Sequence, residues 1–109
     1  MPQFVYRVRP TRLGMLTDSP TEREAQAVGE HFAYLSGLTD RGTVLMAGRT
    51  LTADEQTFGI AVLVADTPEQ AEAIMNGDPA VEQGVMRAEL FPFQIVLWSE
   101  NGPPEAAAA

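Results

Sequence analysis

The chain has 109 residues, enough for one domain, and 45% of them are hydrophobic. It carries 15 acidic residues against 7 Lys or Arg, so its formal net charge is −8 at pH 7. That charge repels phosphate backbones and anionic membranes, so we expect neither nucleic acid nor a membrane as a partner. Cysteine is absent, which excludes disulfides, Cys-based zinc sites and thiol nucleophiles.

The sequence shows no targeting or membrane-spanning segment. Arg7 and Arg9 lie inside an alternating segment rather than ahead of an apolar run, so the N-terminus does not resemble a signal peptide. A membrane-spanning helix needs about 18 consecutive apolar residues, and the chain has no such stretch. We therefore expect a cytoplasmic protein.

The first half of the chain predicts a strand followed by a helix. Apolar and polar residues alternate over residues 3–9, which is typical of a strand. The tetrapeptide Ser19-Pro20-Thr21-Glu22 offers a capping hydroxyl, a proline and a glutamate at helix-start spacing, and Arg41-Gly42 predicts the end of the helix. We expect the apolar side of this helix to consist of Ala25, Val28, Phe32 and Leu35.

Two strands and a second helix are predicted next. The strands cover residues 43–49 and 58–65, and we expect them to pair across a polar loop. Thr67-Pro68-Glu69-Gln70 repeats the capping pattern, and Asn76-Gly77 ends the helix that starts there. Asp78-Pro79 then begins one further helical turn, which ends near Gly84.

The chain is predicted to close with a long strand over residues 86–98, in which Pro92 implies an edge position or a bulge. Residues 99–109 are expected to be a disordered tail, which leaves residues 1–98 as a single domain. The order β-α-β-β-α-β predicts an α+β, ferredoxin-like fold. In this fold two helices cover one face of a four-stranded antiparallel sheet.

The last two strands are apolar on both of their faces. A sheet with one face in water should instead alternate apolar and polar residues. We therefore expect a homodimer in which the uncovered sheet faces of two copies meet.

His31 and Asp78 are the candidate catalytic residues. His31 is the only histidine and lies about 70° from the middle of the apolar side of the first helix, where it is either a half-buried structural ring or an acid–base catalyst. Asp78 is well placed to cap the turn that follows it, and its ionised carboxylate also suits an imidazole partner. Spacing alone leaves the structural and the catalytic readings open for both residues.

Two further residues are candidates for substrate binding. Arg49 follows Ala47-Gly48 at the end of a strand, where its guanidinium can hold a carboxylate or phenolate or form a surface salt bridge. Tyr34 lies one turn beyond His31 and can donate a phenolic hydrogen bond, or extend its hydroxyl to water. No metal or cofactor is expected, since one histidine cannot supply a catalytic metal set and no phosphate-loop motif occurs.

The chain resembles the YCII-related (YciI-like) family in four segments: EHFAYL at residues 30–35, VLMAG at 44–48, FGI at 58–60 and DPAVEQGV at 78–85. The resemblance implies a dimeric α/β-barrel type with a ferredoxin-like protomer. It also implies a histidine–aspartate active site, which maps onto His31 and Asp78. Arg49 stands where many relatives have proline and Ala80 where many have an aromatic residue, so the pocket is expected to differ and no substrate carries over.

These observations favour a small dimeric enzyme in which His31 acts as general acid or base and Asp78 orients it. The expected chemistry is cofactor-free isomerisation or elimination on a small organic molecule. One alternative is a non-catalytic ligand-binding or accessory domain with the same cleft. Another is a structural dimerisation module, which would require side chains to fill the cleft.

Overall fold

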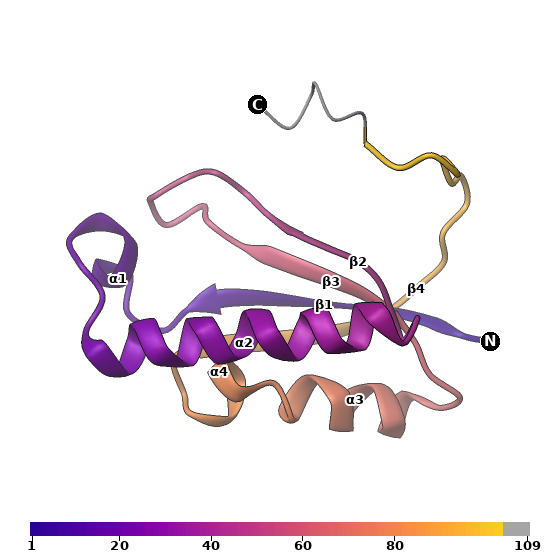
Figure 1. Ribbon diagram of the computed structural model, residues 1–109, viewed down its shortest axis with the longest axis horizontal. Coiled ribbons are helices and arrows are strands. Elements are labelled where there is room, and N and C mark those ends of the chain that lie inside the picture. Colours follow the sequence, from indigo (N-terminus) through magenta and orange to yellow (C-terminus); the bar gives the residue numbers. More distant parts are fainter. Residues whose placement is uncertain (104–109) are drawn as a thin grey trace.

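The computed structural model describes residues 1–103, and Figure 1 shows its elements in chain order. They are β1 (Gln3–Pro10), α1 (Gly14–Thr17), α2 (Glu22–Asp40), β2 (Val44–Arg49), β3 (Gly59–Val64), α3 (Pro68–Asn76), α4 (Pro79–Glu82) and β4 (Met86–Phe93). Apart from the single helical turns α1 and α4, the order is the predicted β-α-β-β-α-β. The turn at α1 was not predicted.

The four strands form one antiparallel sheet in the order β2-β3-β1-β4. Helices α2 and α3 run across one face of this sheet (Figure 1). The predicted α+β, ferredoxin-like fold is therefore confirmed. Pro92 lies in the edge strand β4, opposite Phe4, where the missing N–H of proline does not interrupt a central ladder.

The core lies between the helices and the sheet. Alternate residues of β1 point into it, as the alternation predicts. The buried cluster consists of Phe4, Tyr6, Val8, Leu38, Val44, Ala61, Leu63, Ala65, Ala71 and Met75.

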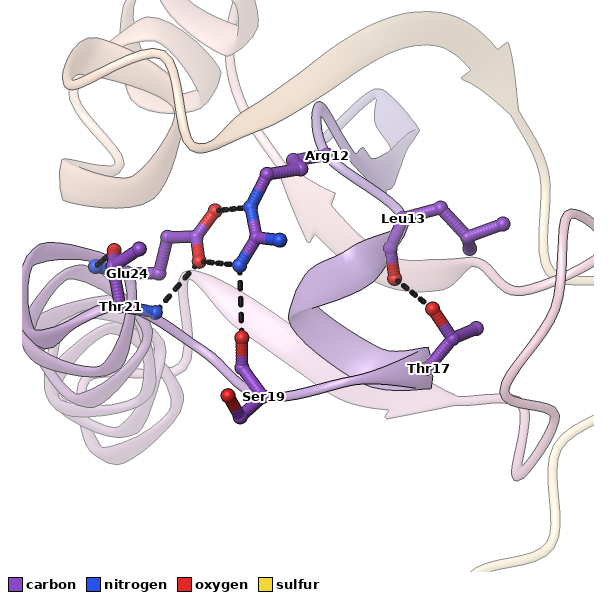
Figure 2. A network of polar contacts seen from close by, with 6 residues as sticks. All are labelled: Arg12, Leu13, Thr17, Ser19, Thr21 and Glu24. Atoms are coloured by element: carbon purple, nitrogen blue, oxygen red, sulfur yellow. Dashed lines mark hydrogen bonds and ion pairs between the residues drawn. The ribbon is translucent and has the colours of Figure 1, made fainter.

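Helix α2 begins two residues later than predicted. Its cap is Thr21, whose hydroxyl accepts from the N–H of Glu24 while Glu24 Oε1 accepts from the N–H of Thr21. Arg12 fixes this arrangement, because its guanidinium donates to both Glu24 carboxylate oxygens and to the carbonyl of Ser19 (Figure 2). Thr21-Glu22-Arg23-Glu24 is thus a second capping box that overlaps the predicted one and replaces it.

The buried face of α2 also differs from the prediction. Ala27 and Leu38 are buried, whereas Phe32 is 73% exposed. Of the predicted apolar stripe, Val28 and Leu35 are half-buried and pack against the core, whereas Ala25 and Phe32 are exposed. All four residues also line an open cleft. The core-facing line of α2 instead runs from Ala27 through His31 and Tyr34 to Leu38.

The predicted last strand is too long, because β4 ends at Phe93 rather than at residue 98. Its partner β1 begins at Gln3, which pairs with Phe93, so no neighbouring strand remains beyond that point. The Gln3 side chain instead accepts a hydrogen bond from the N–H of Ile95. Of the predicted tail, residues 104–109 lie outside the described part of the chain. No helix within residues 1–103 is long and apolar enough to cross a membrane.

Candidate active site

A cleft of about 890 Å³ opens between α2 and the inner face of the sheet. Small residues in the sheet make room for it. Ala61 of β3 pairs with both Tyr6 and Ala47, and the next inner row consists of Val8, Gly59 and Arg49. Because paired residues point to the same face of a sheet, Ala47, Gly59 and Ala61 leave a shallow floor beside the buried Tyr6 and Val8.

Gly59 is closely packed by its neighbours and also borders the cleft. A Cβ atom at Gly59 would lie 3.3 Å from the carbonyl oxygen of Gly48 and 3.3 Å from Val8 Cγ2. A larger side chain there would push against these atoms and project into the cleft. The floor of the cleft therefore depends on glycine at this position.

Asp78 is fully buried beside this cleft and is held by three contacts. As the cap of α4 it accepts from the N–H of Ala80 at Oδ1, over 3.0 Å. Its Oδ2 accepts from the hydroxyl of Tyr6 over 2.8 Å and lies 2.6 Å from His31 Nδ1. A buried carboxylate is tolerated only when its oxygens are compensated in this way.

His31 meets Asp78 at the wall of the cleft. Its side chain is 15% exposed and lies among the residues that line the cleft. Since Tyr6 and Ala80 already donate to the carboxylate, the contact at Nδ1 is best made by an Nδ1–H donor. The other ring nitrogen, Nε2, then carries a lone pair, and no group within residues 1–103 hydrogen-bonds it.

Further bonds tie α2 to the segment that carries Asp78. The guanidinium of Arg23 donates to the carbonyl of Gln83 over 2.8 Å, and the amide of Gln83 donates to Glu30 Oε1 over 2.7 Å. Glu30 directly precedes His31, and Arg23 lies eight residues before His31 on the same helix. These bonds fix the approach of the helix to α4, and with it the position of the imidazole over the carboxylate.

Tyr6 is a member of this site that the sequence pattern does not indicate, because alternation places it only on the apolar face of the first strand. Burial, and then the charge of Asp78, raise the pKa of its hydroxyl far above the usual value, so the hydroxyl remains a donor. A chemical argument could have indicated this role, because a tyrosine at a core-facing strand position needs a hydrogen-bond partner for its hydroxyl.

The structure separates the two candidates for substrate binding. Arg49 lines the cleft, on the inner face of β2. Tyr34 does not line it, and its hydroxyl donates to the carbonyl of Ile74 over 2.7 Å, which joins α2 to α3. Within residues 1–103 no three side chains of the His, Asp or Glu type gather as a metal site.

Comparisons with known proteins identify relatives of this arrangement. The sequence profile of the YCII-related domain matches residues 8–94. Among solved structures, the 5-chloro-2-hydroxyhydroquinone dehydrochlorinase TftG from Burkholderia phenoliruptrix AC1100, in complex with 2,5-dihydroxybenzoquinone, has a similar fold. It matches with a TM-score of 0.61 and 20% identity, over 86% of this chain and 94% of that chain. No curated protein sequence matches significantly.

Proposed function

The chain belongs to the YCII-related domain family, and we propose that it is an enzyme in which His31 moves protons on a small organic molecule bound in the cleft. One observation carries the proposal. His31 Nδ1 lies 2.6 Å from the buried Asp78 Oδ2 while the ring borders an open cleft. An imidazole held by a carboxylate on one side and open to a ligand on the other is the arrangement of a general base.

In this proposal Asp78 acts through His31. The carboxylate holds the Nδ1–H tautomer, so the lone pair of Nε2 faces the cleft and can accept a proton from a C–H or O–H bond of the substrate. The electron pair of that bond then shifts into a double bond. In an elimination a leaving group departs from the adjacent carbon, whereas in an isomerisation the imidazolium returns the proton at another atom.

Asp78 also stabilises the imidazolium that forms, because the two charges lie within hydrogen-bond distance in a buried site. Tyr6 is a positioning residue, since its hydroxyl holds the carboxylate oxygen that faces His31. The TftG protein of similar fold is named a dehydrochlorinase, and loss of hydrogen chloride includes removal of a proton. That chemistry is compatible with a His–Asp pair and supports the same reaction class here.

Solvent exchange provides a direct test that needs no known substrate. A panel of small cyclic ketones and quinols is incubated with the protein in D₂O, and NMR follows loss of protons next to the carbonyl or hydroxyl carbons. We expect exchange of at least one panel member, and we expect His31→Gln to lower its rate by about 10²-fold or more. Asp78→Asn should also lower the rate, because Asn can no longer select the Nδ1–H tautomer.

The alternative function gives a different result. A ligand-binding or accessory domain would bind panel members, visible as saturation transfer from protein to ligand, without catalysing exchange. In that case His31→Gln would leave binding unchanged. Ser36→Ala serves as a matched control for α2, since Ser36 also borders the cleft but is not among the residues that hydrogen-bond His31 or Asp78 over residues 1–103.

A further inference from the structure

Arg49 is placed as a ligand contact rather than as part of the scaffold. It is the last residue of β2 and pairs with Gly59, which in turn pairs with the buried Val8. The three residues therefore share the inner face of the sheet. Because Gly59 has no side chain, the base of the Arg49 side chain borders the open cleft floor, to which Arg49 contributes.

No protein carboxylate neutralises Arg49 within the described residues. The arginine ion pairs found over residues 1–103 are Arg7–Glu89 and Arg12–Glu24. Asp40 also borders the cleft, from the end of α2, without forming an ion pair with Arg49. Arg9 also borders the cleft without an ion pair in this part of the chain, but it follows the inward-facing Val8 on β1 and pairs with Arg87, so its side chain leaves the strand on the outer face. Of these two arginines, Arg49 is the one whose side chain starts from the inner face of the sheet.

The rest of the cleft is mostly apolar. Its lining includes Leu16, Val28, Phe32, Leu35, Phe58 and Met86. Phe32 is 73% exposed, which leaves an aromatic face uncovered where α2 borders the opening. Burial of such a face by a ligand is favourable by the hydrophobic effect, and flat rings pack well against it.

We propose that the ligand of this cleft is a ring carboxylate, an aromatic or alicyclic acid whose carboxylate is held by Arg49 and whose ring lies against Phe32 and Phe58. This rests on the proposed function, because it names the class of molecule that His31 would act on. A guanidinium presents N–H donors in a planar fork that matches a carboxylate. The fork supplies the local positive charge that an anion needs in a protein of net charge −8.

The sheet also separates Arg49 from the Asp78 site. Tyr6, which contacts the carboxylate of Asp78, lies on β1, and Arg49 lies on β2, with β3 between them. Neighbouring strands are about 4.8 Å apart, and Arg49 belongs to the inner row of Val8 and Gly59, two residues along from the row of Tyr6, so roughly 12 Å separates the two Cα atoms. The carboxylate that Arg49 holds is therefore a different group from the one on which His31 acts, and the ring joins the two.

Two pairs of probes test the proposal: benzoate against benzamide, and 2-naphthoate against 2-naphthamide. Each pair keeps the ring and removes the charge. In calorimetric titrations the wild-type protein should bind each carboxylate about tenfold or more tightly than its amide, the size expected for a charged hydrogen-bonded pair. Arg49→Gln should remove this preference by weakening the carboxylates and leaving the amides unchanged, whereas Arg49→Lys should keep part of it.

Arg87→Gln is the matched control. It removes an exposed arginine of β4 that does not line the cleft, so it should preserve the carboxylate preference. Equal binding of carboxylates and amides by the wild-type protein would overturn the proposal. So would a preference that survives in Arg49→Gln, or no binding of any probe at millimolar concentration.

The same titrations separate this proposal from the proposed function. His31→Gln should retain the carboxylate preference, because Arg49 and the apolar walls remain in place, even though proton exchange is lost. If the exchange experiment fails while Arg49→Gln abolishes the preference, the cleft binds ring acids without catalysis. If exchange depends on His31 while the preference is absent, the enzyme acts on neutral molecules and the ring-carboxylate proposal is wrong.

Discussion

The hydroxyl of Tyr6 donates to the same oxygen of Asp78 that faces His31, over 2.8 Å and across 72 residues of sequence. Tyr6 belongs to β1, one of the two central strands, and Asp78 caps the short helix α4. This bond attaches the buried carboxylate to a central strand of the sheet. His31 then approaches from α2, so three separate elements meet at one buried oxygen.

Tyr6→Phe should therefore destabilise the protein. The substitution removes one donor from a fully buried carboxylate and adds none, and such a loss costs about 1–3 kcal/mol of unfolding free energy. Urea unfolding followed by circular dichroism measures this free energy. Tyr34→Phe is the control, since it removes a hydrogen bond to the carbonyl of Ile74 and leaves the Asp78 site intact. Equal stability of Tyr6→Phe and wild type would contradict the assigned role of the bond.

Both tyrosines should resist ionisation in the folded protein. Burial, followed by the charge of Asp78, raises the pKa of Tyr6 far above the usual value and raises that of Tyr34 as well. A phenol whose pKa is raised on folding contributes stability that is complete below the unfolded value of about 10 and is lost as the pH rises above it.

Alkaline titration checks this expectation through phenolate absorbance. The absorbance should stay low through pH 10 and increase together with unfolding, rather than with a separate midpoint near the usual value. Tyr34→Phe leaves Tyr6 as the only tyrosine, so its titration isolates the buried hydroxyl. A phenolate signal that appears near pH 10 while the circular dichroism remains native would show that Tyr6 is accessible.

Local patterns in the sequence were sufficient to predict the fold. Alternation identifies β1, and the Thr67 cap identifies α3, since both signals depend only on neighbouring residues. The same local rules do not decide between two capping sequences that overlap, as they do at residues 19–22 and 21–24. The contact of Arg12 with Glu24, twelve residues apart, selects the later one.

The site was only partly predictable because it depends on contacts between distant segments. Periodicity identifies Phe32 as apolar, but it does not say whether an apolar stripe faces a core or an open cleft. His31 and Asp78 were paired through the family resemblance rather than through spacing. The Tyr6 contact requires the register of β1 and the position of α4, neither of which the sequence specifies alone.

The capping network of α2 should make the stability of the folded protein fall at acidic pH. Hydrogen bonds from Arg12, and then the bond from the Thr21 backbone, lower the pKa of Glu24 to about 2 from the usual 4.5 (Figure 2). A carboxyl whose pKa is lowered on folding contributes stability that is present above pH 4.5 and is lost as the pH falls toward 2.

Comparison of Glu24→Gln with wild type isolates this contribution. Glutamine keeps the length of the side chain and can still cap the helix, but it lacks the charge. The two proteins should differ most in thermal midpoint at neutral pH and converge as the pH approaches 2. Glu22→Gln, an exposed change in the same first turn, should show a smaller difference. A constant gap between Glu24→Gln and wild type across this range would exclude the carboxylate as its source.

The outer face of the sheet leads to a final prediction about assembly. Val5 pairs with Val62 on one side and with Phe91 on the other, so an apolar row crosses three strands on the face away from α2 and α3. Phe91 is 42% exposed and Phe93 is 44% exposed on the same face. Val62 is already buried, at 3% exposure, whereas the two phenylalanines leave apolar surface uncovered. We propose that a second copy covers Phe91 and Phe93, because uncovered apolar surface on a small domain favours self-association.

Sedimentation at micromolar concentration should then give about twice the chain mass of 11.8 kDa. Phe91→Asp should shift the protein to the monomer mass, since it places a charge in the apolar row and would leave that charge desolvated in the dimer. Leu51→Asp is the control, because Leu51 is 87% exposed in the loop between β2 and β3 and lies outside the row. Circular dichroism confirms that both variants fold. A wild-type protein that sediments as a monomer, or a Phe91→Asp variant that remains a dimer, would show that this face does not form the interface.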